Sequence, residues 1–104
     1  MKKREEYIEA VRNYSLYSNK QRNILAVLIE SAIQDIATIS PRILSEVTGA
    51  TQPVVYKAIK RFIEDGIMES LNTKTGKLGV FKISTIKLDE IEEIHEKTKS
   101  IKNK

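Results

Sequence analysis

The side chains best suited to chemistry lie close together in one stretch, residues 52–61. This stretch contains an amide, a phenol and three cations, with no carboxylate before Glu64: Gln52, Tyr56, Lys57, Lys60 and Arg61. Cations bind phosphate oxygens, an amide can pair with a base edge, and a phenol can contact either group. The set therefore indicates binding to a polyanion such as a nucleic acid. The alternative is an ordinary solvated face of a core helix, because runs of charge usually are solvated.

A helix is expected to position these side chains. Apolar residues recur at helical spacing along one side of a helix that begins at Gln52: Val55, Ile59, Phe62 and Ile63. The opposite side then presents Gln52, Pro53, Tyr56, Lys57 and Lys60. We expect Thr51 to cap this helix and Pro53 to lie in its first turn, where no intrahelical donor is lost. Gly66 is expected to end the helix.

A second, shorter helix is predicted just before this one. Ser40-Pro41 is a start signal, since it combines a capping hydroxyl with a proline at the first helical position. Ile43, Leu44 and Val47 are expected to turn inward, and Gly49 to stop the helix. Ser40 and Arg42 could donate to a phosphate, because a helix N-terminus offers free N–H groups. Ser40 is equally well explained as a cap alone.

The remaining segments predict a single α+β domain, mainly α-helical with a small β-hairpin. A first helix at 1–17, a core at 18–84 and a last helix at 85–104 are the expected divisions. Within them we expect helices over 3–17, 19–34 (capped by Ser18) and Leu88 to about 101, a brief strand at 36–39, and hairpin strands at 67–71 and 78–83. The hairpin tip, residues 72–77, carries Lys74 and Lys77.

The segment SPRILSEVTGATQPVVYKAIKRFIEDGIM resembles the helix-turn-helix of small winged-helix transcription regulators of the MarR, Lrp or ArsR kind. The matching features are an apolar residue four positions after the cap, a small residue after it, a glycine in the turn, and a glycine-aliphatic pair leading to the wing: Leu44, Ser45, Gly49 and Gly66-Ile67. The resemblance covers roughly residues 20–84. Thr48 departs from the pattern, because an aliphatic residue is usual before the turn glycine.

The resemblance implies a winged helix-turn-helix with extra terminal helices that binds double-stranded DNA. The front of the 52–61 helix would enter the major groove. Gln52 could pair with adenine, Tyr56 could contact a base edge, a thymine methyl or a phosphate, and Lys57, Lys60 and Arg61 would bind phosphate or guanine. Lys74 and Lys77 on the wing could lie along the backbone or the minor groove, although a lysine-bearing hairpin is equally an ordinary solubility feature.

The terminal helices carry apolar stripes outside the minimal winged-helix core: Tyr7, Ile8, Val11 and Tyr14 in front, and Ile91, Ile94 and Ile101 behind. Regulators of this kind commonly dimerise through such helices, so the resemblance implies a homodimer, with the C-terminal helix as the favoured interface. The alternative is that both helices fold back onto their own domain.

Composition sets further limits. The 104 residues contain no cysteine, the net charge is only +4, and the longest apolar run is far too short to span a bilayer. No secretory signal is apparent, so a cytoplasmic, nucleoid-associated location is expected. A single histidine, His95, argues against a metal site, and Thr75–Lys77 lacks the flanking residues of a phosphate-binding loop. We expect no cofactor and no enzymatic activity.

Three functions follow from these expectations. The leading one is a homodimeric transcription regulator that binds a specific double-stranded DNA site. A second is a DNA-organising or plasmid-maintenance protein with little sequence preference, which would depend on Lys57 and Lys60 more than on Gln52 and Tyr56. A third is a winged-helix module that binds another protein and no nucleic acid. The mild net charge of +4 favours this alternative.

Overall fold

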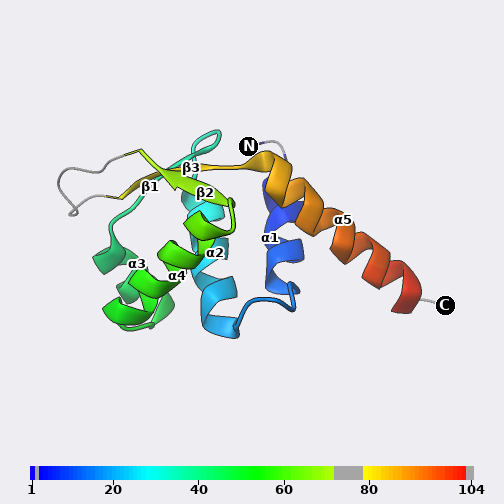
Figure 1. The fold of residues 1–104 in the computed structure, drawn as a ribbon, viewed down its shortest axis with the longest axis horizontal. Helices are drawn as coiled ribbons and strands as arrows, with labels where there is room; N and C mark the ends of the chain where they lie inside the picture. Colours follow the sequence, from blue (N-terminus) through cyan, green and yellow to red (C-terminus); the bar gives the residue numbers. More distant parts are fainter. Residues whose placement is uncertain (2, 72–78, 103–104) are drawn as a thin grey trace.

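The computed structural model describes residues 1, 3–71 and 79–102 of the chain. Within these residues the chain is mainly helical with one small antiparallel sheet, which confirms the expected α+β class (Figure 1). The elements are α1 (Arg4–Arg12), α2 (Asn19–Ser31), β1 (Ile36–Thr38), α3 (Pro41–Thr48), α4 (Gln52–Glu64), β2 (Met68–Ser70), β3 (Val80–Ile83) and α5 (Thr85–Lys102).

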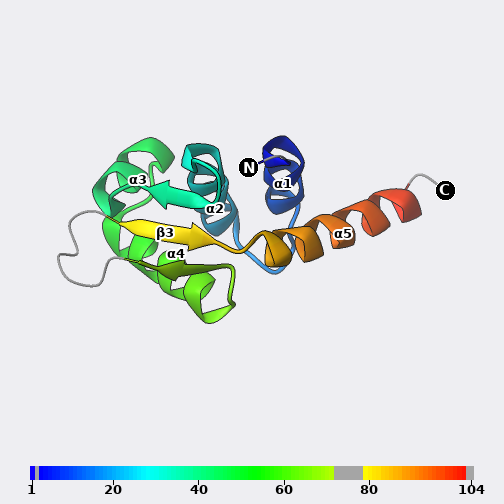
Figure 2. The ribbon, with the colours of Figure 1, turned by 90° about the horizontal axis from the view of Figure 1, so that it is seen from above.

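The sheet has the strand order β1-β3-β2, so that β3 lies between the two other strands (Figure 2). Both pairings are antiparallel, and Phe81 at the centre of β3 faces Ala37 on one side and Ser70 on the other. The three strand segments were predicted, but the pairing of β1 with the hairpin was not. Because Ala37 and Phe81 are both buried, this pairing closes one side of the core.

Helix α2 is the centre of the core, as its apolar circumference predicts. Ile24, Leu25, Leu28 and Ile29 are fully buried, and α1, α3, α4 and β1 all contact this helix. Ser18 begins α2 with a capping box, in which its hydroxyl accepts from the Gln21 backbone N–H and the Gln21 side chain accepts from the Ser18 N–H.

The turn between α3 and α4 is held by two hydroxyl groups. Gly49 ends α3 in the left-handed conformation with φ 76°. Thr48 donates to the Leu44 carbonyl oxygen at 2.6 Å and accepts from the Ala50 N–H at 3.3 Å, while Ser45 donates to the Ala50 carbonyl oxygen. The unusual threonine before the glycine therefore supplies an acceptor for the Ala50 N–H, which an aliphatic residue cannot do.

Several predicted boundaries were wrong. Helix α1 ends at Arg12 and not at residue 17, because Tyr14 and Tyr17 lie in a turning connection in which Tyr17 is buried against Phe62. Helix α2 ends at Ser31 and not at 34, since two hydrogen bonds between Ile33 and Ile36 close a tight turn there. Helix α5 begins at Thr85, ahead of Leu88, with the Ser84 hydroxyl accepting from the Lys87 N–H.

Three apolar residues expected to face inward are exposed instead. Ile43 is 43% exposed, Val47 60% and Ile63 39%. Helix α3 buries only a narrow side, made by Pro41 and Leu44, so that its other apolar residues remain outside. Thr51 does begin α4 but its side chain makes no capping hydrogen bond, which corrects the expected role of its hydroxyl.

The two terminal helices lie side by side at the end of the molecule away from α3 (Figures 1 and 2). The Tyr7 hydroxyl donates to Asp89, Lys3 pairs with Glu92, and Leu88 and Ile91 are buried beneath. The second half of α5 extends beyond α1 and away from the rest of the domain. Among the described residues, no helix has the length and apolar character needed to cross a membrane.

Candidate nucleic-acid interface

Helix α4 presents the predicted side chains on its outer side. Its inner side is buried through Val55, Ala58, Ile59 and Phe62, and it packs against α2, α3 and β2. The outer side is exposed along its whole length, as predicted: Gln52, Pro53, Tyr56, Lys57 and Lys60. The helical spacing of the apolar residues therefore predicted the orientation of α4 correctly, apart from Ile63 at the margin of the buried side.

An open groove between α3 and α4 brings predicted residues of both helices together. It is lined by Ser40, Pro41, Arg42, Ile43, Glu46, Gln52 and Tyr56. Ile43 and Glu46 also belong to this surface and were not predicted from the sequence. Ile43 was assigned to the core by its helical spacing. The signal that could have corrected this is the shortness of α3, which can bury few of its apolar residues against α2 and α4.

The cations around the groove differ in how firmly they are engaged. Arg42 lies 3.4 Å from Glu46 and Lys60 lies 4.0 Å from Glu64, in exposed pairs within their own helices. Such pairs contribute about 0.3–0.5 kcal/mol each, so an incoming phosphate can replace either carboxylate at little cost. Lys57 has no ion pair within the described part of the chain. It is therefore the cation that is most available for an anionic ligand.

Arg61 belongs to a different cluster. Its Nε donates to Asp65 at 2.8 Å, the hydroxyl of Tyr17 donates to the same carboxylate oxygen at 2.7 Å, and the guanidinium lies 5.3 Å from the centre of the Tyr17 ring. The hydrogen bond from Tyr17, together with that from Arg61, lowers the pKa of Asp65. Burial raises the pKa of the Tyr17 phenol. The structure thus places Arg61 toward the α1–α2 connection, apart from Gln52 and Tyr56.

Ser40 acts as the predicted cap. Its hydroxyl accepts from the Ile43 N–H at 3.2 Å while its own proton remains available to a ligand in the groove. Lys74 and Lys77, the predicted wing contacts, lie outside the described residues. The strands on either side of this segment, β2 and β3, are described and paired.

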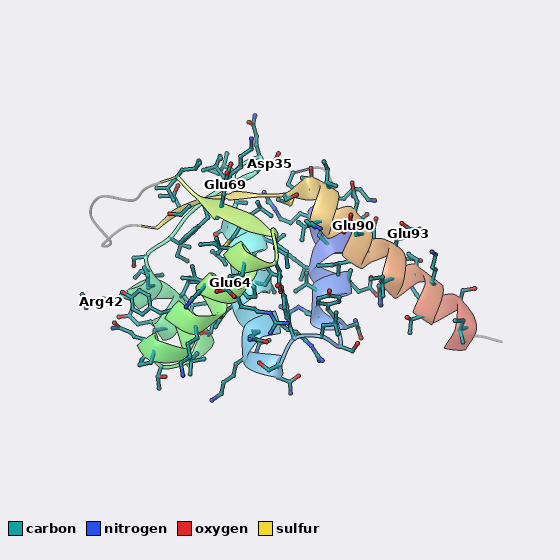
Figure 3. The ribbon with its side chains drawn as sticks, viewed as in Figure 1. Asp35, Arg42, Glu64, Glu69, Glu90 and Glu93 are labelled. Atoms are coloured by element: carbon teal, nitrogen blue, oxygen red, sulfur yellow. The ribbon has the colours of Figure 1, made fainter. Side chains whose placement is uncertain are left out.

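The carboxylates of α5 lie far from this surface. In Figure 3, Arg42 is at the end of the molecule opposite α5, and Glu90 and Glu93 project from α5. Glu64 lies on α4, where it faces Lys60.

No group of three or more potential metal ligands occurs among the residues that the structure describes. The chemistry available at the groove is therefore hydrogen bonding through an amide and a phenol, apolar contact through Ile43, and charge neutralisation by nearby cations.

Comparisons of the chain with protein-family models, with curated proteins and with solved structures gave no significant match. The interpretation of the groove consequently depends on its own residues and on the way in which α3 and α4 present them.

Proposed function

We propose that this chain is a winged helix-turn-helix protein that binds double-stranded DNA and regulates transcription as a homodimer. The order of elements supports this proposal, since two helices joined by a tight turn at Gly49 are followed by a hairpin of β2 and β3. In such an arrangement α4 enters the major groove and the hairpin lies against the flanking backbone.

The observation that carries the proposal is the state of the front of α4. Within the described residues, the Gln52 amide and the Tyr56 hydroxyl make no side-chain hydrogen bond, and Lys57 beside them has no ion pair. A helix fits the major groove, and the residues in its first turns come closest to base edges. Unengaged polar groups in those turns are therefore available for base edges and phosphates.

The neighbouring helix supplies contacts that set position. Ser40 and Arg42 stand at the N-terminus of α3, where backbone N–H groups and the helix dipole favour an anion. Lys60 lies one helical turn after Tyr56 on α4, and it can exchange Glu64 for a phosphate. Such backbone contacts fix the register of a protein on the duplex, while base contacts give specificity.

The homodimer is proposed to form through the second half of α5. Ile94 is 52% exposed and Ile101 72%, and they are two helical turns apart on the extended part of the helix. Two copies of this second half that pack antiparallel would bring Ile94 of one protomer opposite Ile101 of its partner.

Binding of the purified full chain to a mixed-sequence duplex of about 30 base pairs tests the DNA proposal. Fluorescence anisotropy is measured over a salt series. Affinity that falls steeply with salt supports phosphate contacts, because each neutralised phosphate releases a counterion. The absence of binding at low salt would rule out the proposed function.

Solution mass tests the dimer separately. We expect a dimer for the native chain and a monomer for Ile94→Lys. Ile86→Lys is the matched control, because Ile86 is also exposed on α5 but lies near its start. A dimer that survives Ile94→Lys would place the interface elsewhere.

A second candidate function is a protein-binding module. It is favoured by the pairing of Arg42, Lys60 and Arg61 with carboxylates, which leaves the α3–α4 surface only weakly positive. Under this alternative, reversing the charge of Lys57 would leave function intact, whereas changes to the exposed apolar residues of α3 and α5 would abolish it.

A non-specific DNA-organising protein is distinguished from a specific regulator by a weak effect of Gln52→Ala on affinity.

A further inference from the structure

We propose that the groove between α3 and α4 selects A·T base pairs, with the 5-methyl group of thymine against Ile43 and the Gln52 amide on adenine. This inference rests on the proposed function and names the class of duplex that the site would choose. It assigns a specificity-determining role to Ile43, which lies on the helix that precedes the reading helix.

The apolar part of the groove favours thymine. Ile43 lines the groove together with Gln52 and Tyr56 and remains 43% exposed. A phosphate or a polar base edge gains nothing from an aliphatic side chain, whereas a methyl group does. Of the groups that base pairs display in the major groove, the thymine methyl is the apolar one. Ile43 therefore matches thymine better than any other base.

The polar part of the groove favours adenine. Adenine displays one acceptor and one donor in the major groove, which an amide can bind with its own donor and acceptor together. The Gln52 amide has both groups free of hydrogen bonds to the described residues. Guanine displays two acceptors and calls for a cation. Arg42 is the cation that lines the groove, and it lies at the N-terminus of α3, where a phosphate is favoured. Lys57 does not line the groove.

The charges around the groove favour a duplex over an apolar peptide as the occupant. Lys57 lacks a carboxylate partner in the described chain, and Lys60 and Arg42 are held only by exposed pairs. Arg42 and Glu46 line the groove on α3, and Lys57 and Lys60 are exposed on α4, so that a ligand which contacts Ile43 also meets positive charge on both helices. The edge of a thymine beside the phosphates of its own strand has this combination.

The experiment begins with selection of duplexes from a library with a randomised centre, using the purified full chain. We expect A·T pairs to be enriched. In the selected duplex each thymine is then replaced in turn by deoxyuridine, which lacks only the methyl group. At one position per half-site this replacement should weaken binding about fourfold, the value of one buried methyl group.

The variants assign the contact to a side chain. Ile43→Ala should bind the thymine and deoxyuridine duplexes equally, while Val47→Ala should keep the difference. Val47 is the matched control because it is also exposed on α3 but does not line the groove. Gln52→Ala should reduce the preference for A·T by about 5- to 150-fold, the usual range for loss of a bidentate base contact. Thermal melting establishes that each variant is folded.

The possible failures are distinguishable. Duplex binding with G·C pairs enriched, or with no preference, would overturn the inference and leave DNA binding intact. The same holds if the thymine–deoxyuridine difference persists in Ile43→Ala. If no duplex binds at low salt, the proposed function and the inference both fall, and an apolar protein partner becomes the occupant of the groove.

Discussion

The two ends of α4 differ in how far their side chains are engaged. At the front, Gln52, Tyr56 and Lys57 are exposed and make no side-chain hydrogen bond or ion pair within the described chain. At the back, Phe62 is fully buried and Asp65, the residue that follows the helix, joins Tyr17 to Arg61.

This difference separates the part of α4 that stabilises the fold from the part whose side chains are free of hydrogen bonds and ion pairs within the described chain. Buried apolar area and satisfied hydrogen bonds at the back hold α4 to the core. The front contributes little to folding, and its polar groups can be used by a ligand without breaking contacts of the domain. Changes at the back should therefore alter the free energy of unfolding, and changes at the front should alter binding.

The largest effect is expected from Phe62→Ala at the back. Removing this fully buried ring leaves a cavity among α2, α4 and Tyr17 and should lower the free energy of unfolding by about 3–5 kcal/mol. Chemical denaturation followed by circular dichroism measures the change. Tyr56→Ala, an aromatic truncation on the exposed side, is the control and should have a much smaller effect. An unchanged midpoint for Phe62→Ala would contradict the described packing of α4.

Tyr17→Phe should have the next largest effect. The ring is retained against Phe62, but the hydrogen bond to the Asp65 carboxylate is lost, at a cost of about 1–3 kcal/mol in unfolding free energy. Tyr14→Phe is the matched control, since the described structure gives the Tyr14 hydroxyl no hydrogen bond. Equal stabilities of the two variants would show that the Tyr17–Asp65 bond contributes nothing.

A smaller, pH-dependent effect is expected from Asp65. The hydrogen bond from Tyr17, aided by Arg61, lowers its pKa from the ordinary value of 3.8. A carboxyl group whose pKa is lowered on folding adds stability above its unfolded pKa, and this part is lost as the pH falls through the folded value. Denaturation of native chain and Asp65→Asn from pH 6 to about pH 2 measures it. The difference in unfolding free energy between the two proteins should narrow below pH 3.8. A difference that widens there would contradict the direction of the pKa shift.

The smallest effect on stability is expected from Lys57→Glu at the front. An exposed residue without an ion pair in the described structure should change the unfolding free energy by no more than about 0.5 kcal/mol. Duplex binding should weaken sharply, and the slope of affinity against salt should fall by about 1 or more. Lys99→Glu, the same charge change on α5, is the control. Retained affinity in Lys57→Glu would move the binding surface away from α4.

The features that could be predicted from sequence depend on residues within a turn of one another. The caps at Ser18 and Ser40, the proline after Ser40 and the glycine at 49 each satisfy or end a helix locally, and all appear where expected. The orientation of α4 was also predictable, because its apolar residues repeat regularly over several turns.

The features that could not be predicted depend on contacts between distant residues. Asp65 accepts from Tyr17, and this contact turns Arg61 away from the groove, although the charge pattern grouped Arg61 with Lys57. The exposure of Ile43 depends on how much of α3 its neighbours cover, and spacing within the helix does not contain that information. Ile43 was for this reason missing from the predicted site.

Gly49, between α3 and α4, determines whether an L- or a D-residue can replace it in this turn. A Cβ atom added at Gly49 would meet nothing within 4 Å, whereas one added at Gly79 would fall on the Phe81 ring and 2.7 Å from the Ile39 carbonyl oxygen. Gly79 is therefore constrained by space, and Gly49 only by its φ of 76°. A D-alanine favours that conformation, so the mirror-image residue would suit position 49 while L-alanine would strain it. The turn that places α4 thus selects handedness and not size.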